Sequence, residues 1–176
     1  MQNVNFKIHS IAPILFHNVN SMDLIKPKKM THPEFEKSEE VFKARLYIEE
    51  DQITIPSRMI SGLLKKAAQA SGIKQDGKRS TYASLIRAVV FCLDPMILDQ
   101  KLENVIEHKE YVSIQKNKIL RIFPMLKEWS GKIKLTFDEK QISLEALEEI
   151  FNYGGLYCGF GDYRPQFGRF TVSNLN

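Results

Sequence analysis

The chain has 176 residues, which is enough for one domain with a single hydrophobic core and too few to favour two domains. Its composition, 43% hydrophobic and 26% charged, excludes a disordered, collagen-like or coiled-coil protein. No apolar run approaches the roughly 20 residues that cross a bilayer, and the N-terminus lacks the charged and then apolar order of a signal peptide. We therefore expect one cytoplasmic domain over residues 1–176, without a membrane partner.

The net charge of +4 is unevenly distributed along the chain. Residues 58–87 hold seven basic residues and one acid, whereas residues 34–51 hold seven acids and three basic residues. Such segregation is expected of a protein with a polyanionic partner, although a solvated helix face and loop would also explain it. The basic residues of the first segment that we single out as phosphate ligands are Arg58, Lys65, Lys66, Lys78 and Arg79.

The N-terminal part predicts a strand followed by an insertion. Apolar and polar residues alternate over residues 3–11, the period of a half-buried strand. A polar stretch then predicts a long loop that extends to Met30. Thr31 is positioned to cap a short helix that runs towards Phe42.

A hairpin and a long helix come next. Residues 46–48 and 53–55 flank polar turn residues and predict the hairpin. Ser57 is expected to cap a helix with apolar positions at helical spacing, which stops at Ser71-Gly72. Residues 73–81 are polar and basic and predict a loop.

The following elements are expected to be mostly strands. Residues 83–93 fit a buried strand or a helix by pattern alone, and residues 88–93 favour a strand. Residues 111–115 and 118–123 predict a second hairpin, and the alternation over residues 129–137 predicts a further strand.

The C-terminal part predicts a helix, a glycine-rich loop and a last strand. Ser143 is expected to cap the helix, and Gly154-Gly155 are expected to close it. The final strand is predicted over residues 169–172.

The chemistry of the cysteines predicts no metal site. Neither Cys92 nor Cys158 has a second cysteine or a histidine at the spacing of metal ligands, and both lie in apolar surroundings. We interpret both as buried thiols and expect no cofactor.

Five of the nine glycines lie between Gly154 and Gly168. Glycines placed after a helix can expose backbone N–H groups that line a concavity for phosphate. The segment is not a Walker or dinucleotide loop, because it lacks Gly-Lys-Ser/Thr and does not precede a helix. Arginine suits phosphates and aromatic rings suit unstacked bases, so the composition favours single-stranded nucleic acid. The loop residues that we single out are Gly159, Gly161, Tyr163, Arg164, Phe167 and Arg169.

A structural interpretation of the same loop stays open. In that interpretation the loop is a rigid turn, its aromatic rings belong to the core, and Asp162 pairs with Arg164. Both interpretations use the same residues and differ in what the arginine contacts.

Three features, in this order along the chain, resemble the RAMP superfamily of CRISPR-associated proteins. They are Ala12-Pro13-Ile14-Leu15 after the first strand, the strand-to-helix junction over residues 55–65, and the loop with Gly159-Phe160-Gly161 and Phe167-Gly168-Arg169-Phe170. The resemblance spans the chain from end to end. The Gly-x-Gly-Asp-aromatic-Arg-Pro pattern also resembles stand-alone phage and prophage proteins. The chain lacks room for the two complete domains of many members that process CRISPR RNA.

This resemblance implies a ferredoxin-like, RRM-related α+β fold and binding of CRISPR RNA. An antiparallel sheet would be backed by helices over residues 57–70 and 144–153, with residues 19–40 and the hairpin over residues 111–123 as accessories. Some members cleave the repeat, and others coat the guide RNA as subunits beside other CRISPR proteins.

Cleavage without a metal needs a group that removes the 2′-hydroxyl proton and another that protonates the leaving oxygen. His17 is the best-placed candidate if the resemblance holds, because the catalytic histidine of processing members usually lies in the N-terminal half. We nevertheless expect a binder of single-stranded RNA or DNA without catalysis. The alternatives are an endoribonuclease that processes CRISPR RNA and a phage-encoded protein that uses the acidic residues 34–51 to dock on a host complex.

Overall fold

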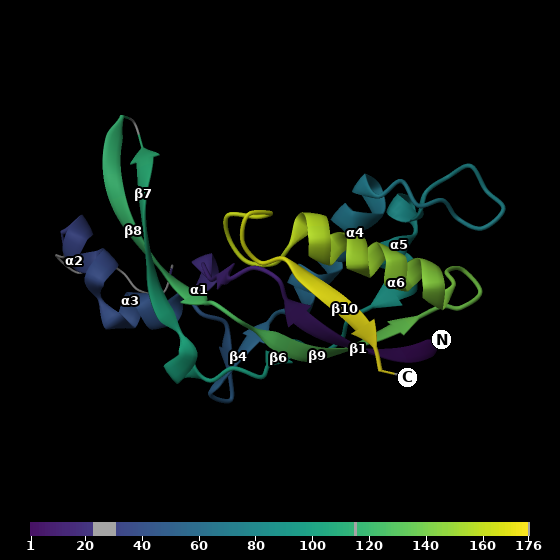
Figure 1. The fold of residues 1–176 in the computed structure, drawn as a ribbon, viewed down its shortest axis with the longest axis horizontal. Coiled ribbons are helices and arrows are strands. Elements are labelled where there is room, and N and C mark those ends of the chain that lie inside the picture. Colours follow the sequence, from purple (N-terminus) through teal and green to yellow (C-terminus); the bar gives the residue numbers. More distant parts are fainter. Residues whose placement is uncertain (23–30, 115, 176) are drawn as a thin grey trace.

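The structure, a computed structural model, describes residues 1–22, 31–114 and 116–175. It has a mixed α+β architecture, in which helices α4 (Ser57–Ala70) and α6 (Leu144–Tyr153) pack on one face of an antiparallel sheet (Figure 1). The α+β class expected from the sequence is therefore confirmed. Among the described residues, no helix combines the length and apolar character needed to cross a bilayer.

The main sheet has seven strands in the order β10-β1-β9-β6-β4-β3, with β5 paired to β9. All of these neighbours are antiparallel. The strands are β1 (Gln2–Ser10), β3 (Ile48–Glu49), β4 (Gln52–Ile55), β5 (Val90–Phe91), β6 (Met96–Leu98), β9 (Ser130–Phe137) and β10 (Phe170–Asn174). Val4, Phe6 and Ile8 of β1 are buried, as the alternation predicts.

Aromatic side chains form the centre of the core. Phe160 stacks on Phe170 at 4.8 Å between ring centroids, and Trp129 meets Phe170 edge-on at 5.7 Å. The indole N–H of Trp129 donates to the carbonyl of Ala12 over 2.9 Å, so its polar group is satisfied inside the protein. The core thus includes one aromatic residue of the glycine-rich loop, Phe160, and anchors that loop on the sheet.

A second, three-stranded sheet lies beside the first. Its order is β2-β8-β7, built from β2 (Ile14–Leu15), β7 (Ile106–Ile114) and β8 (Asn117–Leu126). The hairpin of β7 and β8 extends away from the main sheet (Figure 1). The second hairpin predicted from the sequence is present, and both of its strands are longer than expected.

The insertion after β2 contains short helices rather than one helix. They are α1 (Val19–Met22), α2 (His32–Lys37) and α3 (Glu39–Ala44). The helix expected over residues 31–42 is interrupted because Ser38 has an extended backbone, with φ −69° and ψ 128°. The carboxylate of Glu34 accepts from the backbone N–H of Thr31, which fixes the start of α2. Most of the predicted loop to Met30 lies outside the described residues.

A buried ion pair joins this insertion to the hairpin. Glu36 and Arg45 are 1% and 0% exposed and lie 2.8 Å apart. Glu36 also accepts from the backbone N–H of Ile122 over 3.0 Å, and Arg45 donates to the Ile122 carbonyl. The pair therefore satisfies backbone groups along one edge of β8. Because Glu36 is buried, it does not belong to the acidic surface that the sequence predicts over residues 34–51.

The start of α4 differs slightly from the prediction. Ser57 is the first residue of the helix, and Pro56 occupies the capping position with an extended backbone. In the preceding hairpin, Glu50 and Asp51 form the turn and both have positive φ, 48° and 62°. Gly72, with φ +70°, follows the end of the helix as expected.

The expected strand over residues 88–93 is mostly wrong. Residues Tyr82–Ser84 form a short 3₁₀ turn, Ile86–Val89 form helix α5, and only Val90 and Phe91 are in a strand. Ile86 and Val89 are three positions apart and both buried, which is helical spacing. The apolar run is short enough to fit either structure, and packing decides between them. The three-residue strand β6 was not predicted at all.

Gly154 and Gly155 do not close α6. The chain continues through them as a π-helical turn, η3 (Gly154–Cys158), and Gly159 ends it with φ +69°. A Cβ atom on Gly154 would lie 2.7 Å from a methyl of Leu63, and one on Gly155 would lie 2.4 Å from the carbonyl oxygen of Phe170. These glycines therefore allow η3 to pack closely between α4 and β10.

Candidate nucleic-acid interface

The glycine-rich loop is bound to the segment that follows β1. The N–H of Asp162 donates to the carbonyl of Leu15 over 2.9 Å, and the N–H of Gly168 donates to the carbonyl of Pro13. Within the loop, the N–H of Phe160 donates to the carbonyl of Gly168. Two motifs that lie at opposite ends of the sequence thus form one structural unit.

Several backbone N–H groups of the loop are therefore already satisfied. Those of Gly159, Phe160, Asp162, Tyr163 and Gly168 all donate to protein acceptors. The expectation that the glycines expose N–H groups to phosphate is wrong at these positions. These five N–H groups are therefore not available to a phosphate.

Gly161 is required by a close approach of two chain segments. It has φ +77°, and a Cβ atom there would lie 2.3 Å from the carbonyl oxygen of Leu15. Gly159 has φ +69° and a similar but looser contact, with a Cβ 2.9 Å from the Phe167 carbonyl oxygen. Both predicted site glycines thus hold the loop in place, and Gly161 also borders a pocket.

This pocket, about 320 Å³ in volume, lies between the loop, the start of α4 and the insertion. It is lined by His17, Val19, Tyr47, Met59, Gly161, Asp162 and Arg164. His17 and Arg164, both predicted from the sequence, are therefore brought together. Its lining combines the apolar side chains of Val19 and Met59 with the ionisable side chains of His17, Asp162 and Arg164.

His17 and Asp162 form a pair in this pocket. Nδ1 of His17 lies 3.2 Å from Oδ2 of Asp162, and the backbone N–H of Tyr163 donates to Oδ1 over 2.9 Å. The hydrogen bond with His17 is the main cause that lowers the pKa of Asp162, and burial opposes it. Arg164 adds only a weaker charge effect on that pKa. The structural interpretation of the loop predicted that Asp162 pairs with Arg164. The described side chain that bonds to Asp162 is His17 instead.

The predicted stacking residues are partly engaged with the hairpin. Tyr163 meets Phe123 edge-on at 5.5 Å, and Phe123 meets His17 at 5.7 Å. Phe167 packs against His108 at 5.3 Å between ring centroids. Tyr163 keeps 37% of its surface exposed, so part of its ring remains accessible.

Two exposed cations, Arg58 and Arg164, adjoin the same pocket. The guanidinium of Arg58 lies over the ring of Tyr47, a pocket residue, at 5.7 Å. Burial raises the pKa of Cys158, the last residue of the π-helical turn, and the positive charges of Lys66 and Arg164 oppose that rise. Both cations therefore act on the thiol of this turn. Lys65 is exposed on α4 beside Lys66.

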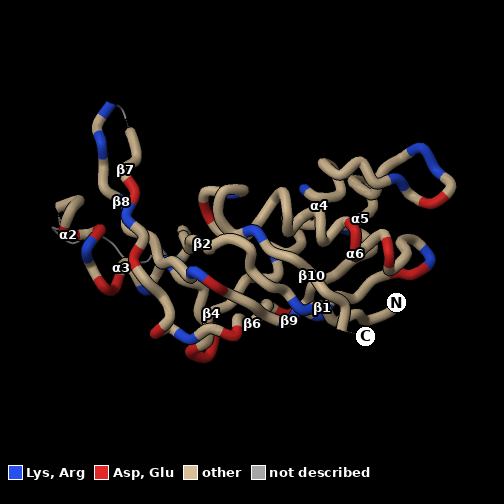
Figure 2. Tube along the Cα trace, viewed as in Figure 1, with Lys and Arg blue, Asp and Glu red and all other residues tan. Residues whose placement is uncertain are grey.

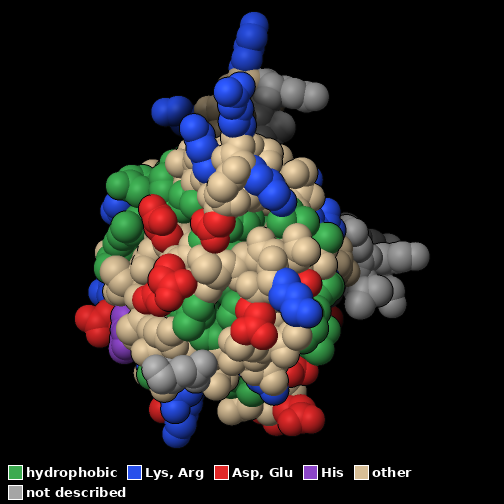
Figure 3. Space-filling model, turned by 90° about the vertical axis from the view of Figure 1, so that its right-hand side faces the viewer, with side chains coloured by type: hydrophobic (Ala, Val, Ile, Leu, Met, Phe, Trp, Pro, Cys, Tyr) green, Lys and Arg blue, Asp and Glu red, His purple; other side chains and the backbone are tan. Residues whose placement is uncertain are grey.

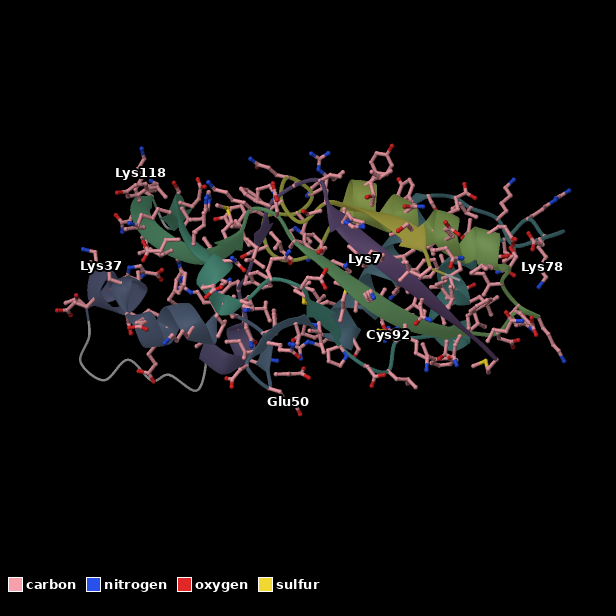
Figure 4. All side chains as sticks on the ribbon, turned by 60° about the horizontal axis from the view of Figure 1, so that its bottom comes forward. Lys7, Lys37, Glu50, Lys78, Cys92 and Lys118 are labelled. Atoms are coloured by element: carbon pink, nitrogen blue, oxygen red, sulfur yellow. The ribbon has the colours of Figure 1, made fainter. Side chains whose placement is uncertain are left out.

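The remaining predicted cations are not part of this group. Lys78 and Arg79 are exposed in the loop that follows the C-terminal end of α4. This loop extends to the right in Figure 1, and Lys78 is labelled at the right-hand end of the molecule in Figure 4. Basic and acidic segments alternate along the trace (Figure 2), and in Figure 3 basic side chains gather above acidic ones at this end. Arg169 is exposed at the start of β10, and its carbonyl accepts from Ile11 and Ala12.

The sequence patterns did not predict some residues of the pocket. Tyr47 and Met59 looked like ordinary hairpin and helix residues, and no motif marks either of them. Asp162 was noticed only as a partner of Arg164. Its neighbour in space, His17, is 145 positions away, which the sequence does not reveal.

The cysteines match the prediction in part. Cys158 is buried, whereas Cys92 is half-buried. Burial is the main cause that raises the pKa of Cys92 to about 11, so its thiol stays protonated at neutral pH. No group of three histidine, cysteine or acidic residues in the described ranges could hold a metal ion.

No family model matches the chain, and no curated protein shows significant similarity to it.

Proposed function

We propose that this protein binds single-stranded nucleic acid, RNA in the first place, without cleaving it. The observation that carries the proposal is the pocket at the start of α4, where Arg164 and His17 meet, with Arg58 over its Tyr47 wall. Arginine and histidine cations suit phosphate oxygens, and exposed aromatic rings suit unstacked bases. The first turn of α4 adds the positive end of a 14-residue helix, since Met59 borders the pocket.

The order of strands supports a ferredoxin-like assignment of the core. Strands β10-β1-β9-β6 are adjacent in that order, α4 lies between β1 and β6 in the sequence, and α6 joins β9 to β10. This corresponds to a βαββαβ unit with a 4-1-3-2 antiparallel sheet. The helical insertion, β4 and the β7–β8 hairpin would be additions to that unit.

The bonds between the loop and the segment after β1 support the RAMP interpretation. Pro13 and Leu15 accept from Gly168 and Asp162, so two of the three resembling motifs form one unit. The third motif, at the start of α4, borders the same pocket through Met59. We infer that a nucleic-acid strand would pass over this junction, with Arg58, Lys66 and Arg164 on its phosphates.

One observation favours an enzyme as the second candidate. A histidine whose Nδ1 is held by a carboxylate is arranged as a general base often is, and His17 with Asp162 has this arrangement. Incubation of the pure protein with labelled repeat RNA in EDTA separates the two functions. The binder leaves the RNA intact, whereas cleavage that His17→Ala abolishes would establish the endoribonuclease.

Binding should weaken steeply as salt rises. For single strands, each phosphate contact contributes about −0.7 to the slope of log K against log salt, so four contacts give a slope of about −3. Fluorescence anisotropy with labelled homopolymer RNA and DNA at several salt concentrations measures this slope. A slope near zero, or no binding at low salt, would refute the proposed function.

A further inference from the structure

The pair of His17 and Asp162 places a titratable group in the proposed binding pocket. The His17 side chain is 29% exposed and that of Asp162 40% exposed, and both line the pocket. Because Nδ1 of His17 lies against Asp162, Nε2 is the ring nitrogen left for another partner. We propose that a phosphate group of the bound strand occupies this pocket and that its binding takes up a proton at His17. This inference rests on the proposed function and adds its regulation by pH.

The protonation state of the ring decides whether it attracts or repels a phosphate. A neutral imidazole that donates from Nδ1 to Asp162 presents a lone pair at Nε2, which repels a phosphate oxygen. The protonated ring donates from both nitrogens, one to the carboxylate and the other to the phosphate. A bound phosphate therefore stabilises the imidazolium from one side while Asp162 stabilises it from the other.

Asp162 keeps its negative charge while histidine titrates. Its pKa is lowered chiefly by the hydrogen bond with His17, against the opposing effect of burial. The carboxylate is therefore ionised throughout the range of about pH 5 to 8 in which histidines usually change charge. A proton taken up on binding in this range therefore does not go to Asp162.

Charged groups lie at the pair or near the rings around it. Arg164 of the loop lines the pocket and acts on the charge of Asp162. Arg58 of α4 lies over the ring of Tyr47, and Arg45 at the end of α3 lies over the ring of Phe123, which contacts His17. Glu110 and Arg121 of the hairpin act on the pKa of Tyr163, the residue after Asp162. Arg45 and Arg121 both pair with the buried Glu36. Neither Arg58 nor Arg164 forms an ion pair with another described residue, so these two cations remain to meet a phosphate beside His17.

The test measures oligouridylate binding between about pH 5.5 and 8 at constant ionic strength. The wild type should bind about tenfold more tightly at the acidic end, since one charge-assisted hydrogen bond is gained there. Calorimetry in buffers of different ionisation enthalpy should show proton uptake on binding, up to about one per site. His17→Gln should keep binding but lose most of both effects.

Two further variants isolate the mechanism. Asp162→Asn removes the charge that stabilises the imidazolium, so we expect a flattened pH profile and tighter binding than the wild type at the alkaline end. His9→Gln is the matched control, because His9 is exposed on β1 and does not border the pocket. This control should keep the pH profile of the wild type.

The possible outcomes separate the two proposals. Binding that is salt-dependent, independent of pH and accompanied by no proton uptake would overturn the inference and leave the proposed function standing. A pH profile that His17→Gln retains would also overturn it. Absence of binding at every pH would refute the proposed function itself.

Discussion

Replacing Gly161 with valine is expected to destabilise the protein by about 3 kcal/mol or more. Two costs add at this position. The backbone has φ +77°, which a β-branched residue rarely adopts, and the new Cβ would lie 2.3 Å from the Leu15 carbonyl oxygen. Chemical denaturation of the two proteins measures the difference in the free energy of unfolding.

Gly72→Val is the matched control for this change. Gly72 has φ +70° and no atom within 4 Å of the position of a Cβ, so the control carries the backbone cost alone. We expect Gly161→Val to be clearly the more destabilising of the two. Equal effects would show that the contact between the loop and Leu15 contributes nothing, and reduced binding at unchanged stability would make Gly161 a binding residue instead.

Glu36→Gln is expected to cost about 3 to 5 kcal/mol of stability, because it removes the charge of a buried carboxylate that lies 2.8 Å from the buried Arg45 guanidinium. The backbone N–H of Ile122 would also lose its charged acceptor. Glu39→Gln is the matched control, since Glu39 pairs with Lys43 at the surface, and we expect no measurable change from it. Thermal and urea unfolding of the three proteins test this prediction.

The same residue should make stability depend on acid pH. Burial raises the pKa of Glu36, but the bonds from Arg45 and Ile122 and the charges of Arg45 and Arg121 outweigh it, so the pKa is lowered. Because the pKa of Glu36 is lower in the folded than in the unfolded protein, the ionised carboxylate stabilises the fold at pH values above the unfolded pKa. This stabilisation is lost as the pH falls through the folded pKa. We expect Glu36→Gln to remove this part of the acid unfolding transition. An unchanged pH profile would contradict the assignment.

Local patterns predicted the elements that periodicity defines. The alternation in β1 and β9 and the helical spacing in α4 and α6 each bury one face, and these strands and helices occur where expected. The segment containing α5 and β5 was ambiguous because its apolar residues are contiguous, so packing against α4 and β9 decides its structure. The close packing at Gly155 likewise depends on β10 and is invisible locally.

The site was predicted in part. Residue type and the cluster of glycines predicted His17, Gly161 and Arg164 as site residues, and all three line one pocket. Their relation to Asp162 and Tyr47 depends on tertiary contacts that no sequence spacing encodes. In the same way, the acid count over residues 34–51 could not distinguish the buried Glu36 from its exposed neighbours.

Charge clustering in the sequence also grouped cations that lie apart. Arg58 lies over the ring of Tyr47 at the pocket, which Arg164 also lines, whereas Lys78 and Arg79 belong to the loop beyond the other end of α4. Lys78 contacts Gln75 within that loop. Replacing two cations at the pocket or two cations in this loop therefore changes the net charge equally, but at different places in the fold.

The most direct test of the account compares two double variants in their binding of labelled single-stranded RNA. Arg58→Ala with Arg164→Ala removes two cations beside the pocket, and Lys78→Ala with Arg79→Ala removes two from the distant loop. The account predicts that the first pair lowers affinity about tenfold to a hundredfold and reduces the salt slope by about 1.4, with the melting temperature unchanged. The second pair should change affinity by no more than about twofold. Equal losses in the two double variants, or a loss confined to the Lys78 and Arg79 pair, would contradict the placement of the interface at the pocket.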